Sequence, residues 1–362
     1  MGNNLSDIVN ISISLDSPPV DSSSFDNLLI VGLPPVAEVD LPDVGVYSDL
    51  SEVIEAGYVA IGNSADPVGI AARIAFSQIP KPSKIYIAAM KETETEVLEP
   101  PTDTLQRALD TDGWYVVCPA GIDAAMYEQI AEWTEAQTKM FAYTFLSKTD
   151  PVSDIYYRSQ GWCGLESDEQ LEKDVSEANR YLHVAAVSKI LSYPAGSETW
   201  ANQVLAAVFP SKLSGMLKKA LSDGNSNFFA RYSGKNITMR GRVRAGEWID
   251  IIRGRDWLQN DMQIGIYTLK VVQPKISFGD SGIGQIHNAI LTSLKTAQTR
   301  GIIAEDEYDE DKNLIPGFTV SVPLSASIPP AEKASRVLSG CRFTARPAGA
   351  IHVTNVNGSL AY

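Results

Sequence analysis

The residues best suited to catalysis are few in this chain of 362 residues, and they lie far apart in the sequence. They are His183, His287, His352, Cys118, Cys163 and Cys341. A nucleophile needs a base within hydrogen-bonding reach, and neither Cys163 nor Cys341 has a local signature of such a pair. His183 and His287 fall within predicted helices, where a structural histidine is more common than a catalytic one. We therefore predict no catalytic residue and no enzymatic activity.

Two short runs have compositions that could bind a nucleotide or a metal ion. Residues 279–284 are rich in glycine, but their spacing differs from G-x-G-x-x-G and no first βαβ unit contains them. A turn followed by the start of a helix is the favoured interpretation. Residues 305–311 are almost entirely acidic, but they lack the central glycine and the final glutamate of an EF-hand loop, which favours a solvated loop. We predict no cofactor and no metal site.

The charge of the chain is strongly negative and unevenly distributed. A formal net charge of −14 argues against direct contact with nucleic acid. Residues 1–72 hold eleven acidic side chains and no basic one, whereas residues 231–255 hold seven basic ones, among them Arg240, Arg242 and Arg244. These stretches are either two solvated faces or complementary surfaces that steer one subunit onto the next. On the second interpretation, these three arginines are subunit-interface residues.

The sequence also indicates where the chain resides. It has no run of about 18 apolar residues, so we predict no membrane insertion. The start has neither a basic segment nor an apolar stretch behind it, which excludes an ordinary signal peptide. The cysteines are scattered and odd in number, as is typical of a reducing compartment.

The elements that would position any site alternate between strands and helices in the first half of the chain. This rhythm is typical of an α/β domain, and we assign it to residues 25–195. The predicted strands cover residues 28–32, 84–88, 114–118 and 140–146, and the predicted helices cover 50–56, 66–78, 123–133 and 167–183. Residues 91–103 are acidic and rich in threonine and proline, and are predicted to form a loop.

A turn at residues 193–197 predicts a domain boundary, and an α+β domain is expected over residues 196–349. Its predicted helices cover residues 199–209 and 211–221, followed by two long helices that contain 258–269 and 283–297. Its predicted strands cover residues 228–232, 236–240, 247–253, 318–322 and 341–346. The predicted fold class is therefore α/β to α+β with more than one domain.

Both ends of the chain are predicted to be strand-forming arms, over residues 1–24 and 350–362. Residues 9–15 alternate apolar and polar side chains, which gives a strand with one apolar face. The second arm is rich in β-branched residues. A lone strand needs a sheet edge, either in its own chain or in another copy. On the second alternative the arms supply subunit-interface residues, namely Val9, Ile11, Ile13, Leu15, Ile351, Val353 and Val356.

The second half of the chain resembles a known family. Residues 246–258 match the pattern G-E-x-I-D-V-x-x-G-x-D-W-L of bacteriophage contractile tail sheath proteins of the Myoviridae type, apart from isoleucine in place of the valine. The resemblance continues in order through residues 274–283, 301–304, 339–340 and 348–352. Residues 5–13 are similar to the start of that family, and residues 194–200 to its P-G-S-x-T-W motif. Residues 90–110 depart from the pattern, and we expect a variable loop there.

The resemblance implies a multi-domain sheath subunit whose terminal strands are exchanged with neighbours. Such subunits stack as hexameric rings around a tail tube protein, with a baseplate and a tail terminator at the ends. Contraction of the stack drives the tube through the host cell envelope during genome ejection, and no cofactor is consumed. The expected location is the contractile tail of the virion, after assembly in the cytoplasm of a bacterial host.

Two other functions stay open on the sequence alone. The first is a soluble α/β enzyme of unknown chemistry, whose terminal strands would pair within the chain. The second is the sheath of a tailocin or of a secretion-type contractile particle, which the residues do not distinguish from a phage tail.

Overall fold

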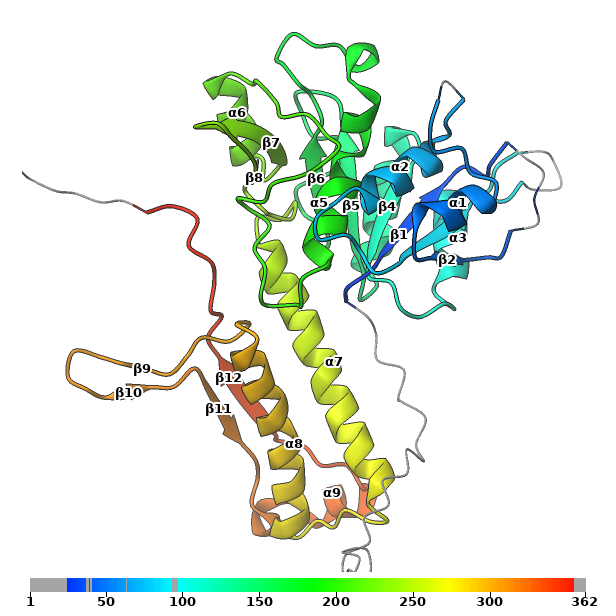
Figure 1. Cartoon of the computed structure of the whole chain (residues 1–362). Helices are drawn as coiled ribbons and strands as arrows, with labels where there is room; N and C mark the ends of the chain where they lie inside the picture. Colours follow the sequence, from blue (N-terminus) through cyan, green and yellow to red (C-terminus); the bar gives the residue numbers. More distant parts are fainter. Residues whose placement is uncertain (1–24, 37–38, 40, 63, 93–96, 355–362) are drawn as a thin grey trace, which may run out of the picture.

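The computed structural model describes residues 25–36, 39, 41–62, 64–92 and 97–354. Residues 25–248 form a wide body around one large sheet, and residues 249–349 form a narrow part built on two long helices (Figure 1). We call these the body and the stalk. The predicted arm residues Val9, Ile11, Ile13, Leu15 and Val356 lie outside the described residues, and their strand pairing stays a prediction.

The body is built on an eight-stranded sheet in the order β2-β3-β1-β4-β5-β6-β7-β8. The strands are β1 (Leu28–Gly32), β2 (Gly45–Tyr47), β3 (Ile85–Ala89), β4 (Val116–Ala120), β5 (Met140–Phe145), β6 (Ser159–Cys163), β7 (Asn227–Tyr232) and β8 (Lys235–Met239). Strands β3 through β7 are parallel in this order, and β2 and β8 pair antiparallel at the two edges. Burial on both faces explains why the central strands are continuous apolar runs.

Helices cover both faces of this sheet. One core contains side chains of α1 (Leu50–Glu55), α2 (Pro67–Phe76) and α5 (Leu182–Leu191). The other contains side chains of α3 (Pro101–Ala108), α4 (Tyr127–Glu135) and α6 (Gly215–Asp223). The predicted caps of the first two helices are confirmed. Asp49 accepts hydrogen bonds from the amides of Ser51 and Glu52, and Asp66 accepts one from Gly69.

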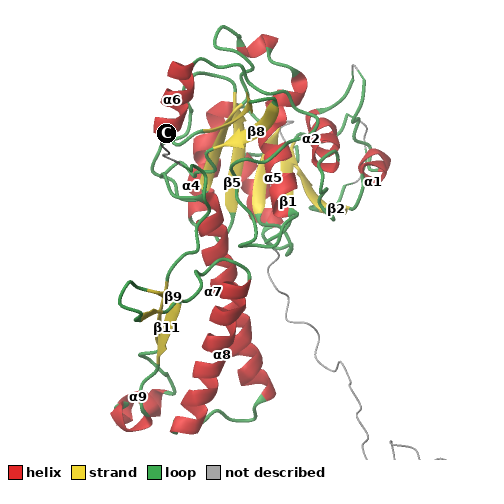
Figure 2. Cartoon of the chain, turned by 60° about the vertical axis from the view of Figure 1, so that its left-hand side comes forward, coloured by secondary structure: helices red, strands yellow, loops and turns green. Residues whose placement is uncertain are grey.

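The stalk begins where α7 (Ile249–Val272) leaves the body, and α8 (Asp280–Thr299) packs back along it (Figure 2). A two-stranded antiparallel sheet of β11 (Phe318–Ser321) and β12 (Arg342–Ala345) lies against this helix pair. A small hairpin of β9 (Glu307–Tyr308) and β10 (Leu314–Ile315) projects from the same side, and α9 (Pro330–Ser335) lies at the far end. None of the described helices combines the length and the apolar character needed to cross a membrane.

The predicted boundary at residue 196 is wrong. Strands β7 and β8 join the sheet of the body through the parallel pairing of β6 with β7, so the α/β unit continues to about residue 248. The turn at residues 193–197 exists, but it leads into a loop that returns to the same sheet. A local turn does not show which sheet the following strands join, and that missing information caused the error.

Four predicted elements are also wrong. Residues 247–253 contain no strand, because α7 starts at Ile249. The β-branched run favoured a strand in the prediction. Ile249 and Ile252 are spaced by about one helical turn, however, and both side chains are buried in the body core. Residues 199–209 form a loop, in which Asn202 and Ala207 have positive φ. The helix expected over 167–183 starts only at Leu182, and α3 occupies part of the region predicted as a loop.

Candidate functional site

Three of the candidate catalytic residues, Cys118, Cys163 and His183, lie in environments that suppress reactivity. Burial raises the pKa of the Cys118 thiol well above its ordinary value and that of Cys163 to about 12, so neither is a thiolate at neutral pH. His183 is buried against Thr144, whose hydroxyl lies 2.8 Å from its Nδ1, and burial lowers its pKa to about 3. The described residues contain no group of three or more potential metal ligands.

The two runs whose composition could bind a nucleotide or a metal ion have structural roles. Residues 279–284 begin α8, with Gly279 at its N-cap position, as the sequence predicted. The acidic run 305–311 includes β9 and the turn of the hairpin, and Asp309 accepts two hydrogen bonds from Asn313 there. The glutamate side chain of β9 pairs with Arg346 at 2.9 Å.

The arginines predicted for the interface have separate environments. Arg240 is exposed, and its Nε donates to the Ser222 hydroxyl at 2.7 Å. Arg242 is half-buried, with its guanidinium 4.4 Å from the ring centroid of Trp248. A subunit contact for these two arginines stays a prediction.

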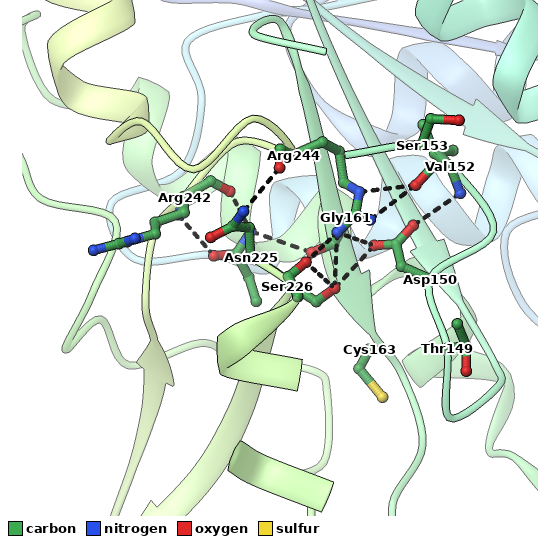
Figure 3. A network of polar contacts seen from close by, with 12 residues as sticks. Thr149, Asp150, Val152, Ser153, Gly161, Cys163, Asn225, Ser226, Arg242 and Arg244 are labelled. Carbon is green, nitrogen blue, oxygen red and sulfur yellow. Dashed lines mark hydrogen bonds and ion pairs between the residues drawn. The ribbon is translucent and has the colours of Figure 1, made fainter. Parts of the chain in front are cut away.

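The expectation for Arg244 is wrong, because this residue is buried with 5% exposure. Its guanidinium lies 3.3 Å from Asp150 and donates to the carbonyl of Val152 from two nitrogens, as Figure 3 shows. Ser226 also bonds the Asp150 carboxylate. Arg244 therefore balances a buried carboxylate within its own subunit. A pattern of charge along the sequence could not separate this role from a surface role.

A second buried cation, Arg253, holds the start of the described chain. Its guanidinium binds Glu198 at 2.7 Å and Asp26 at 2.8 Å, and its Nε donates to the carbonyl of Phe25 at 3.1 Å. Arg253 and Glu198 have no exposed side-chain surface. Phe25 and Asp26, the first two described residues, are therefore held at the first turns of α7. In the sequence, Arg253 is only one of several basic residues of its stretch.

The small sheet of the stalk has open edges. It contains β11 and β12 alone, so each strand has one edge with no strand beside it among the described residues. Successive residues of β12 direct their backbone N–H and C=O groups alternately toward β11 and away from it. The hydrogen bond from the amide of Arg346 to the carbonyl of Gly317 shows which residues face β11. By that alternation, the backbone groups of Phe343 and Ala345 point away from β11, toward the open edge of β12.

A groove of about 590 Å³ runs beside this open edge, between β12 and α7. Its floor on α7 is formed by Leu258, Met262 and Ile266, and Phe343 and Ala345 line the opposite wall. At the end nearest the body lie Asp250, Glu198 and Arg255. The lining of this groove is predominantly apolar. We call it the edge groove.

A second groove of about 610 Å³ continues along the helix pair toward the far end of the stalk. It shares Ile266 with the edge groove, and Ile283, Ile286 and Ile290 of α8 line it. The two grooves thus share a lining residue on α7.

The C-terminal residues that are described lie apart from any strand. Ile351 is 86% exposed and Val353 is 77% exposed, so the apolar side chains predicted for the interface lack cover within the subunit. Between them, His352 is half-buried against Trp248 and Thr199. This contact of His352 could not be predicted from the sequence, because its partners are 104 and 153 positions away.

No protein-family model matches this sequence, and no curated protein matches it either. The fold does have relatives among solved structures. A chain of the baseplate of the anti-feeding prophage aligns with a TM-score of 0.70 and 12% identity, covering 98% of this chain and 99% of that chain. A chain of the contracted helical sheath of the same prophage aligns with a TM-score of 0.68 and 12% identity, covering 97% and 98%.

A third relative is the sheath tail protein from Desulfitobacterium hafniense. It aligns with a TM-score of 0.54 and 9% identity, covering 86% of this chain and 93% of that chain. Alignments over nearly the whole length include both the body and the stalk, so the similarity concerns the complete architecture. The chain therefore has the mixed α/β fold of these prophage sheath and sheath tail proteins.

Proposed function

We propose that this protein is the structural subunit of a contractile phage tail sheath. Its copies polymerise as hexameric rings around a tail tube, and contraction drives the tube through the host envelope during genome ejection. The observation that carries the proposal is an open sheet edge beside an apolar groove, in a chain with the sheath fold over its whole length. A structural polymer needs such acceptor edges and needs no catalytic centre, so we propose no enzymatic role.

We assign the acceptor role to the β11–β12 sheet. The arm of one copy, residues 9–15, adds alongside β12 of another copy, with Val9, Ile11, Ile13 and Leu15 facing the edge groove. An added strand of this length makes several main-chain hydrogen bonds, each with a net value of about 0.5–1.5 kcal/mol, and it also buries its apolar face. The C-terminal arm adds to the open edge of β11 in a further copy through Val353 and Val356, and Ile351 contacts that copy at the root of the arm.

This division of roles places the stalk toward the tail tube and the body at the periphery. The stalk carries both acceptor edges, so connections between subunits stay in the inner layer while the bodies change position during contraction. The ends of the sheath contact the baseplate and the tail terminator. The sheath is part of the virion and assembles in the host cytoplasm. We propose a phage tail, although residues 246–258 do not distinguish it from a tailocin or a secretion-type particle.

The direct test is electron microscopy of the purified protein, combined with a variant that blocks the edge groove. The wild type is expected to form tubes or rods. Met262→Arg should stop their formation, because a guanidinium in the groove would be buried without a partner under the added strand. Thr268→Arg, on an exposed part of the same helix, should assemble as the wild type does. Tubes of normal yield from the Met262 variant would exclude the edge groove as the acceptor.

Assembly is also expected to depend on pH through Asp250, which lies at one end of the edge groove. Burial, and secondarily the nearby Glu198 carboxylate, raise the pKa of Asp250 to about 6. An added strand disfavours the ionised form further and therefore raises this pKa in the assembled state. Assembly should strengthen as pH falls toward about 6 and level off at lower pH, where Asp250 is neutral in the free subunit as well. Light scattering should show a critical concentration several-fold lower at pH 5.5 than at pH 7.5.

The matched comparison for this effect is Asp250→Asn against Asp261→Asn, on the same helix outside the edge groove. Asp250→Asn should assemble at pH 7.5 with the low critical concentration that the wild type shows at pH 5.5. Asp261→Asn should retain the wild-type pH dependence. If Asp250→Asn responds to pH as strongly as the wild type, another group controls the response.

A further inference from the structure

The C-terminal segment is fixed to the subunit at two separate places. The first place follows β12, where the carbonyl of Arg346 accepts from the amide of Ala304 at 2.8 Å and the amide of Ala348 donates to the carbonyl of Ile302 at 3.1 Å. Gly349 then turns the chain with φ of +64°. These bonds tie residues 346–348 to the stalk.

The second place is His352, which reaches the body. Its Nε2 lies 2.8 Å from the hydroxyl oxygen of Thr199. Its ring meets the Trp248 ring edge-on, with centroids 4.6 Å apart and an interplanar angle of 80°. The guanidinium of Arg242 lies 4.4 Å from the centroid of the same indole. The indole therefore contacts a cation as well as the imidazole, and we call this contact the His352 anchor.

The receptor side of the anchor is held by the body. Arg242 and Trp248 face each other in an antiparallel bridge, so the position of the indole is set by backbone pairing. Trp248 is also the N-cap residue of α7. The carbonyl of Thr199 accepts from Gln203 at 3.0 Å, which fixes the loop that carries the hydroxyl. The neighbours of the imidazole, Ile351 and Val353, are exposed, so His352 alone makes the described side-chain contact.

We propose that the His352 anchor sets the point from which the C-terminal arm leaves the subunit, and thereby its reach. This inference rests on the proposed sheath function, because it concerns an arm that pairs with another copy. With the anchor closed, the free arm begins at Val353. With the anchor open, it begins at Gly349, four residues earlier. Four extended residues add about 13–14 Å of reach.

The reach of the arm matters because an added strand must pair with the acceptor edge in one register. A shift of one residue turns the apolar side chains of a strand to the wrong face of the sheet. An arm that starts from one fixed point, in one direction, meets the acceptor edge in one register. An arm released at Gly349 samples a larger volume and several registers. His352 is therefore a positioning residue for strand exchange.

The test uses the full-length chain with His352→Ala and, from the receptor side, Thr199→Val. A spin label on Val353→Cys, in a background with Cys341→Ser, reports the mobility of the arm root in the unassembled subunit. Both anchor variants should raise the rotational mobility of the label at least threefold. His287→Ala, which replaces a histidine of α8, should leave it unchanged. His352→Gln, which retains a hydrogen-bonding group toward Thr199, should give an intermediate mobility.

Assembly of the unlabelled variants is then followed by light scattering and electron microscopy. His352→Ala and Thr199→Val should reduce the fraction of well-ordered tubes at least fivefold, with the thermal midpoint of the unassembled subunit unchanged. The inference is overturned if the label is equally mobile with and without His352, or if the arm is freed and tubes form normally. If the wild type forms no tubes, the sheath function is rejected together with the arm-length role, and the label alone decides whether the anchor exists.

Discussion

Deletion of residues 1–17 is expected to give a folded, soluble monomer that no longer polymerises. The cores of the body and the stalk are formed by residues from Phe25 onward, so the deletion removes no described core residue. The arm supplies the strand that we place beside β12, and without it the edge groove has no occupant. Light scattering coupled to gel filtration should report a monomer, and its thermal midpoint should match that of the unassembled wild type within about 2 °C.

A pair of point substitutions separates the loss of the strand from the loss of its apolar face. Ile11→Asp places a carboxylate on the face that is meant to enter the edge groove, where an unpaired charge is costly. Ser12→Asp places the same charge on the opposite face of the same strand. We expect the first to abolish tubes and the second to preserve them. Normal sheaths from the truncated chain would disprove the exchange of the N-terminal arm.

The strands of the body could be predicted because local sequence carries their signal. The runs at residues 28–32, 114–118 and 140–146 are buried on both faces, and the structure has strands within a few residues of each. The two long helices were also anticipated, since apolar residues recur with helical spacing where they pack against each other. Local patterns of this kind do not depend on distant partners.

The errors share one physical origin, which is that partners distant in sequence decide the outcome. The residues next to Arg244 in the sequence do not show that its partner is Asp150, a buried carboxylate 94 positions earlier. Likewise, β7 looks like the start of a new sheet until its pairing with β6 is known. The start of α7 contains a β-branched run, but burial of Ile249 and Ile252 in the body core stabilises a helix there. Charge and propensity along the chain cannot supply these long-range contacts.

The proposed assembly surface shows the same division. The family resemblance and the alternating pattern predicted the arms, and the exposure of Ile351 and Val353 is compatible with their use between subunits. The sequence did not predict the proposed acceptor, because the edge groove forms only when α7 and β12 are side by side. The residues that hold the arm roots, Arg253 and His352, bind partners from several separate segments. Such residues become visible only in three dimensions.

Arg253→Ala is expected to lower the stability of the subunit by about 3–5 kcal/mol, the largest loss that we predict for a single substitution. It removes the cation from a buried ion pair and leaves the Glu198 carboxylate, which has no exposed surface, without its counter-charge. The carbonyls of Phe25 and Tyr193 also lose a hydrogen-bond donor. Urea denaturation should show a lower midpoint with an unchanged slope, as expected if the unfolded state is unaltered.

The double variant Arg253→Met with Glu198→Gln shows whether the loss comes from the stranded carboxylate. Removing both charges should recover most of the stability, because the cost lies in an unpaired buried charge and not in the absence of the pair. Arg255→Ala, at a half-exposed site two residues after Arg253, should lower the stability of the subunit by at most about 1 kcal/mol. A loss below about 1 kcal/mol for Arg253→Ala, or no recovery in the double variant, would contradict this account. The double variant could regain its stability and still assemble slowly. Arg253 would then have a second role that neutral side chains do not replace, which is to fix Phe25 and Asp26 at the root of the N-terminal arm.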